Sequence, residues 1–118
     1  MIIDNYINRK ALRERLDGDF GLFKELAQLF FSDSPKLLSA IEDAIRSKNG
    51  EKIGKTSHTM KGAVTNFSAD RAFDAALALE KIGKSNDLNK VDDAFRALSA
   101  EIENMRQALK LMLEENRL

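Results

Sequence analysis

The chain has no cysteine, and its 118 residues include only one histidine and one proline. Without cysteine it has no disulfide framework, no thiolate nucleophile and no cysteine-based zinc site. One histidine leaves only carboxylates as further metal ligands, and no second histidine or Glu-x-x-His spacing accompanies it. The composition therefore argues against a metal centre. The absence of cysteine also suits a reducing cytoplasm.

The chain also lacks net charge and long apolar runs. Its nineteen basic and nineteen acidic residues cancel, so no overall field draws it to nucleic acid or to a membrane surface. No apolar run approaches the roughly 20 residues of a membrane span. Met1 leads into Ile2-Ile3-Asp4, which is unlike a signal peptide. We therefore expect a cytoplasmic protein whose residues 1–118 form a single domain.

Abundant Ala, Leu, Glu and Lys favour helix, and no strand pattern, repeat or linker is present. Asp4 or Asn8 can cap a short first helix that ends near Leu16. In the following Asp17-Gly18-Asp19, glycine suits a left-handed position and Asp19 suits the cap of the next helix. A short N-terminal helix is therefore expected ahead of a longer one.

Pro35 interrupts the second helical stretch. Proline removes a backbone donor inside a helix, yet it is favoured at the first position of a new helix, where Ser34 would be the cap. The apolar stripe continues almost in phase across it. The pattern fits either a kinked helix or two helices nearly end to end, closing at Ser47-Lys48-Asn49-Gly50.

Three further helices are expected. One runs from about Glu51 to Phe67, and Ser68 is the predicted N-cap of the next, which ends near Lys84-Ser85. The last helix has apolar residues at alternating steps of four and three: Val91, Phe95, Leu98, Ile102, Met105, Leu109 and Met112. This heptad spacing predicts an all-α fold, an antiparallel up-down four-helix bundle with an additional short N-terminal helix.

The single histidine, His58, lies on the solvent side of its predicted helix. On a wheel of about 100° per residue, the apolar residues gather within roughly 60° of one direction, and His58 falls about 160° away. The apolar residues are Ile53, Thr56, Met60, Ala63, Val64 and Phe67. On the His58 side the wheel puts Lys61, Gly62, Gly54 and Lys55. An exposed imidazole between a cation and a residue without a side chain is a candidate site.

Two other kinds of chemistry are excluded near this histidine. Gly50-Glu51-Lys52-Ile53-Gly54-Lys55-Thr56 resembles a phosphate-binding P-loop, but that motif needs four residues between its glycines and a preceding strand. Ser57 adjoins His58 in sequence, yet neighbours on a helix do not face each other. Neither nucleotide binding nor a serine–histidine nucleophile is therefore expected.

His58-Thr59-Met60-Lys61-Gly62-Ala63 resembles the His-x-(Leu/Met)-Lys-Gly-(Ala/Ser) core of histidine phosphotransfer (HPt) domains, the phosphocarriers of two-component phosphorelays. The family often carries Glu or Gln 22 residues after the histidine, where this chain has Glu80. Nearly the whole chain fits the family's helix order. One departure is Ser68, because the family often has glycine after the histidine helix.

The resemblance implies that Nε2 of His58 accepts the phosphoryl group while Nδ1 donates a hydrogen bond to Glu80. Glu80 also continues an apolar stripe, where a carboxylate is otherwise costly. From the pattern alone it fits either an acceptor for the histidine or a side chain that reaches water at the rim.

The residues around His58 have separate expected roles. Lys61 would offset the phosphoryl charge. Gly62, which costs about 1 kcal/mol inside a helix, would leave room for a partner's close approach. Lys55, Lys81 and Lys84 are candidates for a basic rim.

The resemblance further implies a carrier without enzymatic activity, cofactor or metal of its own. Its partners would be a histidine kinase and a response-regulator receiver domain, and the receiver would bring the Mg²⁺. An apolar docking patch near His58 is expected, with Leu22, Leu29 and Phe31 as candidates unless they pack under the N-terminal helix. A monomer is the simplest expectation. A non-transferring adaptor of the same fold and a purely structural bundle remain alternatives.

Overall fold

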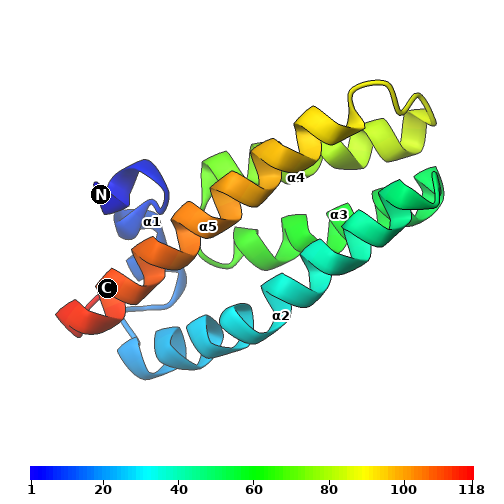
Figure 1. The fold of residues 1–118 in the computed structure, drawn as a ribbon. Coiled ribbons are helices and arrows are strands. Elements are labelled where there is room, and N and C mark those ends of the chain that lie inside the picture. The colour runs from blue at the N-terminus through cyan, green and yellow to red at the C-terminus, as the bar shows by residue number, and fades with distance from the viewer.

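The computed structural model describes residues 1–118 and contains only helices and their connections. A 3₁₀ turn, η1 (Ile3–Asn5), and a short helix, α1 (Arg9–Arg15), precede four long helices. These are α2 (Phe20–Arg46), α3 (Gly50–Thr65), α4 (Asp70–Ser85) and α5 (Val91–Glu115). The predicted antiparallel four-helix bundle with a short N-terminal helix is confirmed (Figure 1). None of the helices is both long and apolar enough to cross a membrane.

The four long helices form a closed ring in which α3 and α5 each contact both α2 and α4. The bundle measures 42 × 22 × 21 Å, and α1 packs across the end where both termini lie (Figure 1). The predicted stripe of α5 turns inward, with Leu98, Ile102, Met105 and Leu109 fully buried. The heptad spacing therefore identified the face that closes the bundle.

Side-chain caps begin three of the helices. Asn8 Oδ1 accepts a hydrogen bond from the Ala11 amide, so Asn8 and not Asp4 caps α1. Asp19 caps α2 as predicted. Gly18 takes the expected left-handed conformation, with φ at +71°. The tight connection between α1 and α2 follows from these residues.

Pro35 lies inside one continuous helix, α2, so Ser34 caps no second helix. Because proline has no N–H, the carbonyl of Phe31, one turn earlier, loses its intrahelical donor. Arg106 from α5 supplies a donor: its Nη1 lies 3.1 Å from Phe31 O and 2.8 Å from Ser34 Oγ. Its guanidinium also lies over the Phe31 ring. α2 passes through the proline because a neighbouring helix replaces the missing donor.

The prediction that Ser68 caps α4 is wrong. The N-cap residue of α4 is Ala69, which makes no side-chain cap, and Ser68 has a left-handed φ of 54°. The Ser68 amide instead donates to Thr65 O at the end of α3, two residues before the predicted Phe67. The connection needs a left-handed residue there, and serine fills that position in place of the glycine common in HPt domains.

Candidate functional site

His58 is presented to solvent by the outer face of α3. Its side chain is 65% exposed, whereas Ile53, Met60 and Val64 on the same helix are fully buried. Ser57 is buried as well and points away from the histidine's side. The helical wheel therefore predicted the orientation of the imidazole correctly.

Glu80 reaches this histidine from α4. Its carboxylate is 3% exposed, and Oε2 lies 2.9 Å from Nδ1 of His58. Of the two interpretations that the pattern left open, the contact with the histidine is the one found, and the side chain does not extend to water at the rim. The 22-residue spacing brings the two groups together because α3 and α4 are adjacent antiparallel helices.

Two lysines complete the surroundings of the carboxylate. Lys61 Nζ lies 2.8 Å from Oε1 of Glu80, and Lys84 Nζ lies 2.9 Å from Oε2. The Lys61 side chain is mostly buried, and its ammonium also lies 5.9 Å from the centroid of the Phe73 ring. A buried carboxylate is costly unless it is paired, and these contacts provide the pairing.

The charge state of Glu80 decides the tautomer of His58. The bonds from Lys61, and then from Lys84 and His58, lower the pKa of Glu80 to about 2 against the opposing effect of burial. Glu80 is therefore ionised at neutral pH and can only accept hydrogen bonds. Nδ1 of His58 must then carry the proton of the bond between them. In the neutral imidazole this leaves the lone pair on Nε2.

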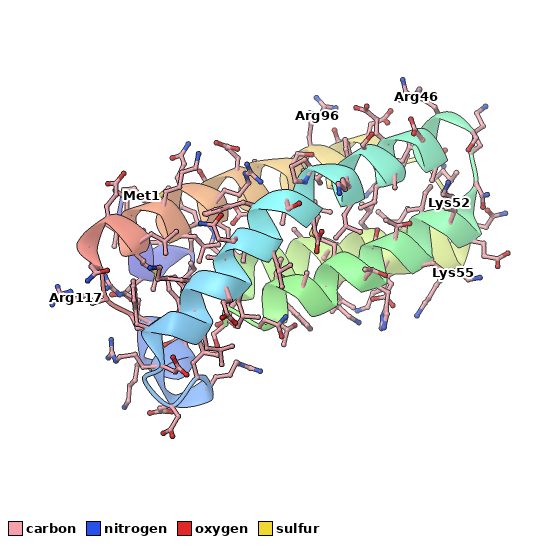
Figure 2. All side chains as sticks on the ribbon, turned by 90° about the horizontal axis from the view of Figure 1, so that it is seen from below. Met1, Arg46, Lys52, Lys55, Arg96 and Arg117 are labelled. Carbon is pink, nitrogen blue, oxygen red and sulfur yellow. The ribbon has the colours of Figure 1, made fainter.

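The flank of His58 is open. Gly62, one turn further along α3, is exposed, and a Cβ built there would meet nothing within 4 Å. On the other side lies a hollow lined by polar and glycine residues, Glu51, Gly54, Lys55, Thr59, Glu80, Gly83, Lys84 and Asn86. Lys52 and Lys55 project outward from α3 at this end of the molecule (Figure 2). A partner can reach the imidazole from this outer face of α3.

Other residues singled out by the sequence lie as follows. Lys55 is exposed and paired with Glu51 at 2.9 Å. Gly54, which the wheel put on the solvent side, is buried against α4, and this part of the prediction is wrong. Leu22 and Leu29 are 39% and 59% exposed on α2, so neither packs under α1. Phe31 is half-buried beneath Arg106.

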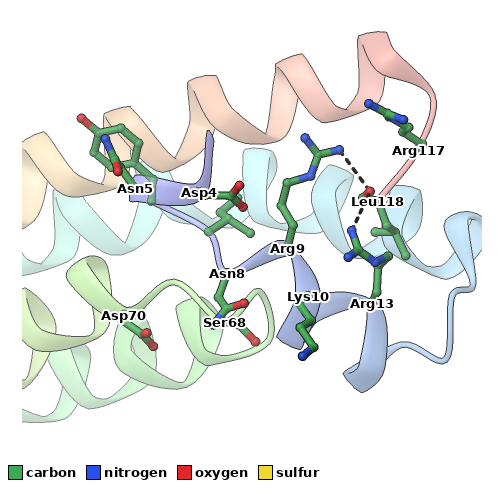
Figure 3. Close-up of a pocket in the computed structure, with 12 residues that line it drawn as sticks. Asp4, Asn5, Asn8, Arg9, Lys10, Arg13, Ser68, Asp70, Arg117 and Leu118 are labelled. Carbon is green, nitrogen blue, oxygen red and sulfur yellow. Dashed lines mark hydrogen bonds between the residues drawn. The ribbon is translucent and has the colours of Figure 1, made fainter. Parts of the chain in front are cut away.

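A second hollow lies at the opposite end of the bundle, between α1 and the last residues of the chain (Figure 3). Its arginines are already engaged: Arg9 bonds Glu115 Oε2 at 2.9 Å and Leu118 O at 3.0 Å, and Arg13 also reaches Leu118 O. It shares no residue with the hollow beside His58. No group of three or more histidine or acidic side chains that could hold a metal ion is present.

The sequence did not reveal that both lysines bind Glu80. The spacing of four between Glu80 and Lys84 is a readable signal for a pair on one helix. The Lys61 contact joins two helices, and only their packing brings it about.

Comparisons with known proteins identify the family and the fold. The family model of the Hpt domain matches residues 25–108, which include the whole of α3 and α4. Among solved structures, the chain is similar to the histidine-containing phosphotransfer protein B (HptB) from Pseudomonas aeruginosa PAO1. The two share 19% identity and a TM-score of 0.80, over 91% of this chain and 90% of that one. No curated protein is significantly similar in sequence. Since the family model covers most of the chain, this protein belongs to the Hpt domain family and functions in histidine phosphotransfer within phosphorelays.

Proposed function

We propose that His58 is the phosphoacceptor and that it takes the phosphoryl group on Nε2. One observation carries the proposal: the chain's only histidine is 65% exposed while its Nδ1 lies 2.9 Å from the ionised, buried Glu80. The bond with Glu80 directs the Nε2 lone pair to solvent, as a nucleophile near neutral pH requires.

The proposed reaction is a reversible exchange with an aspartyl phosphate. The Nε2 lone pair attacks phosphorus, an N–P bond forms, and the bond from phosphorus to the aspartate oxygen breaks, releasing the carboxylate. The proton on Nδ1 remains on the ring and is shared with Glu80, so the positive charge that develops on the imidazole faces a carboxylate. In the return step an aspartate oxygen attacks phosphorus and the N–P bond breaks.

Lys61 and Lys84 are proposed to balance the incoming charge. A phosphoryl group adds about −1.5 to −2 charges. Both ammonium groups lie within 3 Å of the Glu80 carboxylate, close to the imidazole that this carboxylate holds. Lys84 is the more accessible of the two, because its side chain is 70% exposed whereas that of Lys61 is 20% exposed.

The proposed partners are a receiver domain and a histidine kinase, and the chain acts as a carrier without catalytic activity of its own. Mg²⁺ would belong to the receiver. Residues 1–118 are proposed to form one domain that works as a cytoplasmic monomer and binds no nucleic acid. Exposed Leu22 and Leu29 on α2 are candidates for a small apolar contact with the receiver.

Transfer of a labelled phosphoryl group tests the proposal. The protein is mixed with a phosphorylated receiver domain, and the label is followed in the wild type and in His58→Gln. We expect the label on the wild type and none on the variant. Binding without transfer would support the adaptor alternative, and neither binding nor transfer would support the structural bundle.

Gly62→Gln tests the role of the open flank. A side chain there meets no atom of this molecule, so the fold should be kept and even gain from the better helix former. Transfer from a receiver should slow by about tenfold or more, because the longer side chain enters the partner's path. Phosphorylation by a small donor such as phosphoramidate is the control and should change far less. Equal rates with the receiver would contradict the role of Gly62.

A further inference from the structure

We propose that a contact between glycines of α3 and α4 sets the distance between His58 and Glu80. We call Gly50, Gly54 and Gly83 together the glycine contact. These glycines act as positioning residues because they let two helix backbones meet about one to two turns from His58 and Glu80. The consequence for phosphotransfer rests on the proposed function, but the geometry does not.

Gly83 is the centre of the glycine contact. A Cβ built on it would lie 2.5 Å from Gly54 N, 2.9 Å from Gly54 Cα and 2.7 Å from Gly50 O. All three are backbone atoms, which cannot move aside as the end of a flexible side chain can. Any residue larger than glycine at position 83 therefore requires α3 and α4 to separate.

The glycine contact is continuous with the reactive pair. Gly83 follows Glu80 by three residues, which is about one helical turn. Gly54 precedes His58 by four residues, which is also about one turn. A Cβ on Gly54 would lie 3.6 Å from the backbone oxygen of Glu80 itself. The backbone that carries the carboxylate therefore rests directly on the helix that carries the imidazole.

This contact also explains why the P-loop-like run is present. Gly50 and Gly54, the two glycines of that run, both lie against α4 and are buried. Glycine inside a helix is unfavourable. The close approach of the two backbones gives a reason for it at Gly50 and Gly83, where an added Cβ would lie 2.8 Å and 2.5 Å from a backbone atom of the facing helix. No nucleotide is needed to account for them.

Separation of the helices would act first on the hydrogen bond. The Gly83 Cβ needs about 0.9 Å more space to reach the 3.4 Å of an ordinary contact. A shift of that size would stretch the 2.9 Å bond between His58 Nδ1 and Glu80 Oε2 beyond hydrogen-bond range. His58 would then exchange between tautomers and present an unprotonated Nε2 for only part of the time.

Three alanine variants form a graded test. The closest backbone atom of the facing helix would lie 3.6 Å from the added Cβ in Gly54→Ala, 2.8 Å in Gly50→Ala and 2.5 Å in Gly83→Ala. The fraction of His58 protonated on Nδ1 is measured from the ¹⁵N NMR shifts of the imidazole, and transfer is measured from a phosphorylated receiver. We expect the Nδ1-protonated fraction and the transfer rate to fall least for Gly54→Ala and most for Gly83→Ala. Transfer to Gly83→Ala should slow about ten- to a hundredfold.

A Glu80→Ala background separates positioning from general damage to the fold. If Gly83→Ala acts through the bond between His58 and Glu80, it should slow transfer little further once that bond is gone. If Gly83→Ala lowers the transfer rate equally with Glu80 and with Glu80→Ala, the proposal is overturned. Imidazole ¹⁵N shifts in Gly83→Ala that equal those of the wild type would also overturn it. Should Gly83→Ala fail to fold, Gly50→Ala decides by the same readouts. Failure of the wild type to accept phosphoryl would contradict the proposed function, while the ¹⁵N comparison would still test the glycine contact.

Discussion

At the scale of single residues, Glu80 connects the parts of the site. One carboxylate accepts from His58 Nδ1 and pairs with both Lys61 and Lys84. A glutamine could replace it as the acceptor for the histidine, but only an anion also pairs with two ammonium groups. The negative charge of this residue therefore favours one histidine tautomer, and we expect it to stabilise the fold as well.

Acid should remove this stabilisation. The pKa of Glu80 is lowered from 4.5 to about 2 in the folded chain, so its contribution is full above about pH 4.5 and is lost as the pH falls towards 2. Because water screens the exposed Lys84, we expect a loss on the order of 2 kcal/mol. Urea unfolding of the wild type and of Glu80→Gln measures it: the difference in their free energies of unfolding should shrink between pH 5 and pH 2. A difference independent of pH would contradict the assignment.

Much of the site could be predicted from single residues, and the remainder depends on packing. The periodicity of one helix was enough to orient His58. The contact made by Glu80 could not be decided from the sequence, because an apolar stripe shows where a side chain points and not which group it contacts. The contact between Lys61 and Glu80 joins α3 to α4, so no local pattern contains it.

At the scale of helices, the residues where a helix begins and the effect of a proline inside a helix were the hardest features to predict. Ser68 is a good N-cap by residue type, yet the connection between α3 and α4 requires a left-handed residue at that position. The preference of serine for a cap was weaker than the geometry of the turn. Pro35 stayed ambiguous because the donor that compensates for it lies on α5, 75 residues after Phe31 in the chain.

Ser68→Gly should stabilise the protein. Serine in a left-handed conformation has a steric cost that glycine does not have, partly offset by the greater freedom of glycine in the unfolded chain. We expect a gain of about 0.5–1 kcal/mol in the free energy of unfolding. Ser68→Ala is the matched control and should give no gain, since its Cβ has the same clash. Stabilisation by alanine equal to that by glycine would contradict this account.

Arg106→Leu should destabilise α2 in a way that depends on Pro35. The variant leaves Phe31 O and the buried Ser34 hydroxyl without their donor, which should cost about 2 kcal/mol. In a Pro35→Ala background the restored backbone N–H can bond Phe31 O, so the cost should fall by about half. Urea unfolding of the four proteins of this cycle measures it. The same cost in both backgrounds would show that Arg106 does not compensate for the proline.

At the scale of the whole molecule, the heptad spacing and the short connections predicted the bundle. The contacts between its helices could not be predicted and were seen only in the structure. Gly54 is the clearest example. The wheel of α3 put it among solvent residues, but the close approach of α4 at Gly83 buries it. The sequence of one helix indicates one apolar face. A second contact that glycines make, such as that of Gly54 with α4, leaves no hydrophobic pattern in the sequence.

His58 is proposed to carry the phosphoryl group on Nε2 while Glu80 holds Nδ1. Since the chain has one histidine, long-range ¹H–¹⁵N NMR of the uniformly ¹⁵N-labelled, phosphorylated protein tests it most directly. We expect coupling of phosphorus to Nε2 and a proton retained on Nδ1. Phosphorus on Nδ1, or an unmodified imidazole in a protein that carries the label elsewhere, would contradict it.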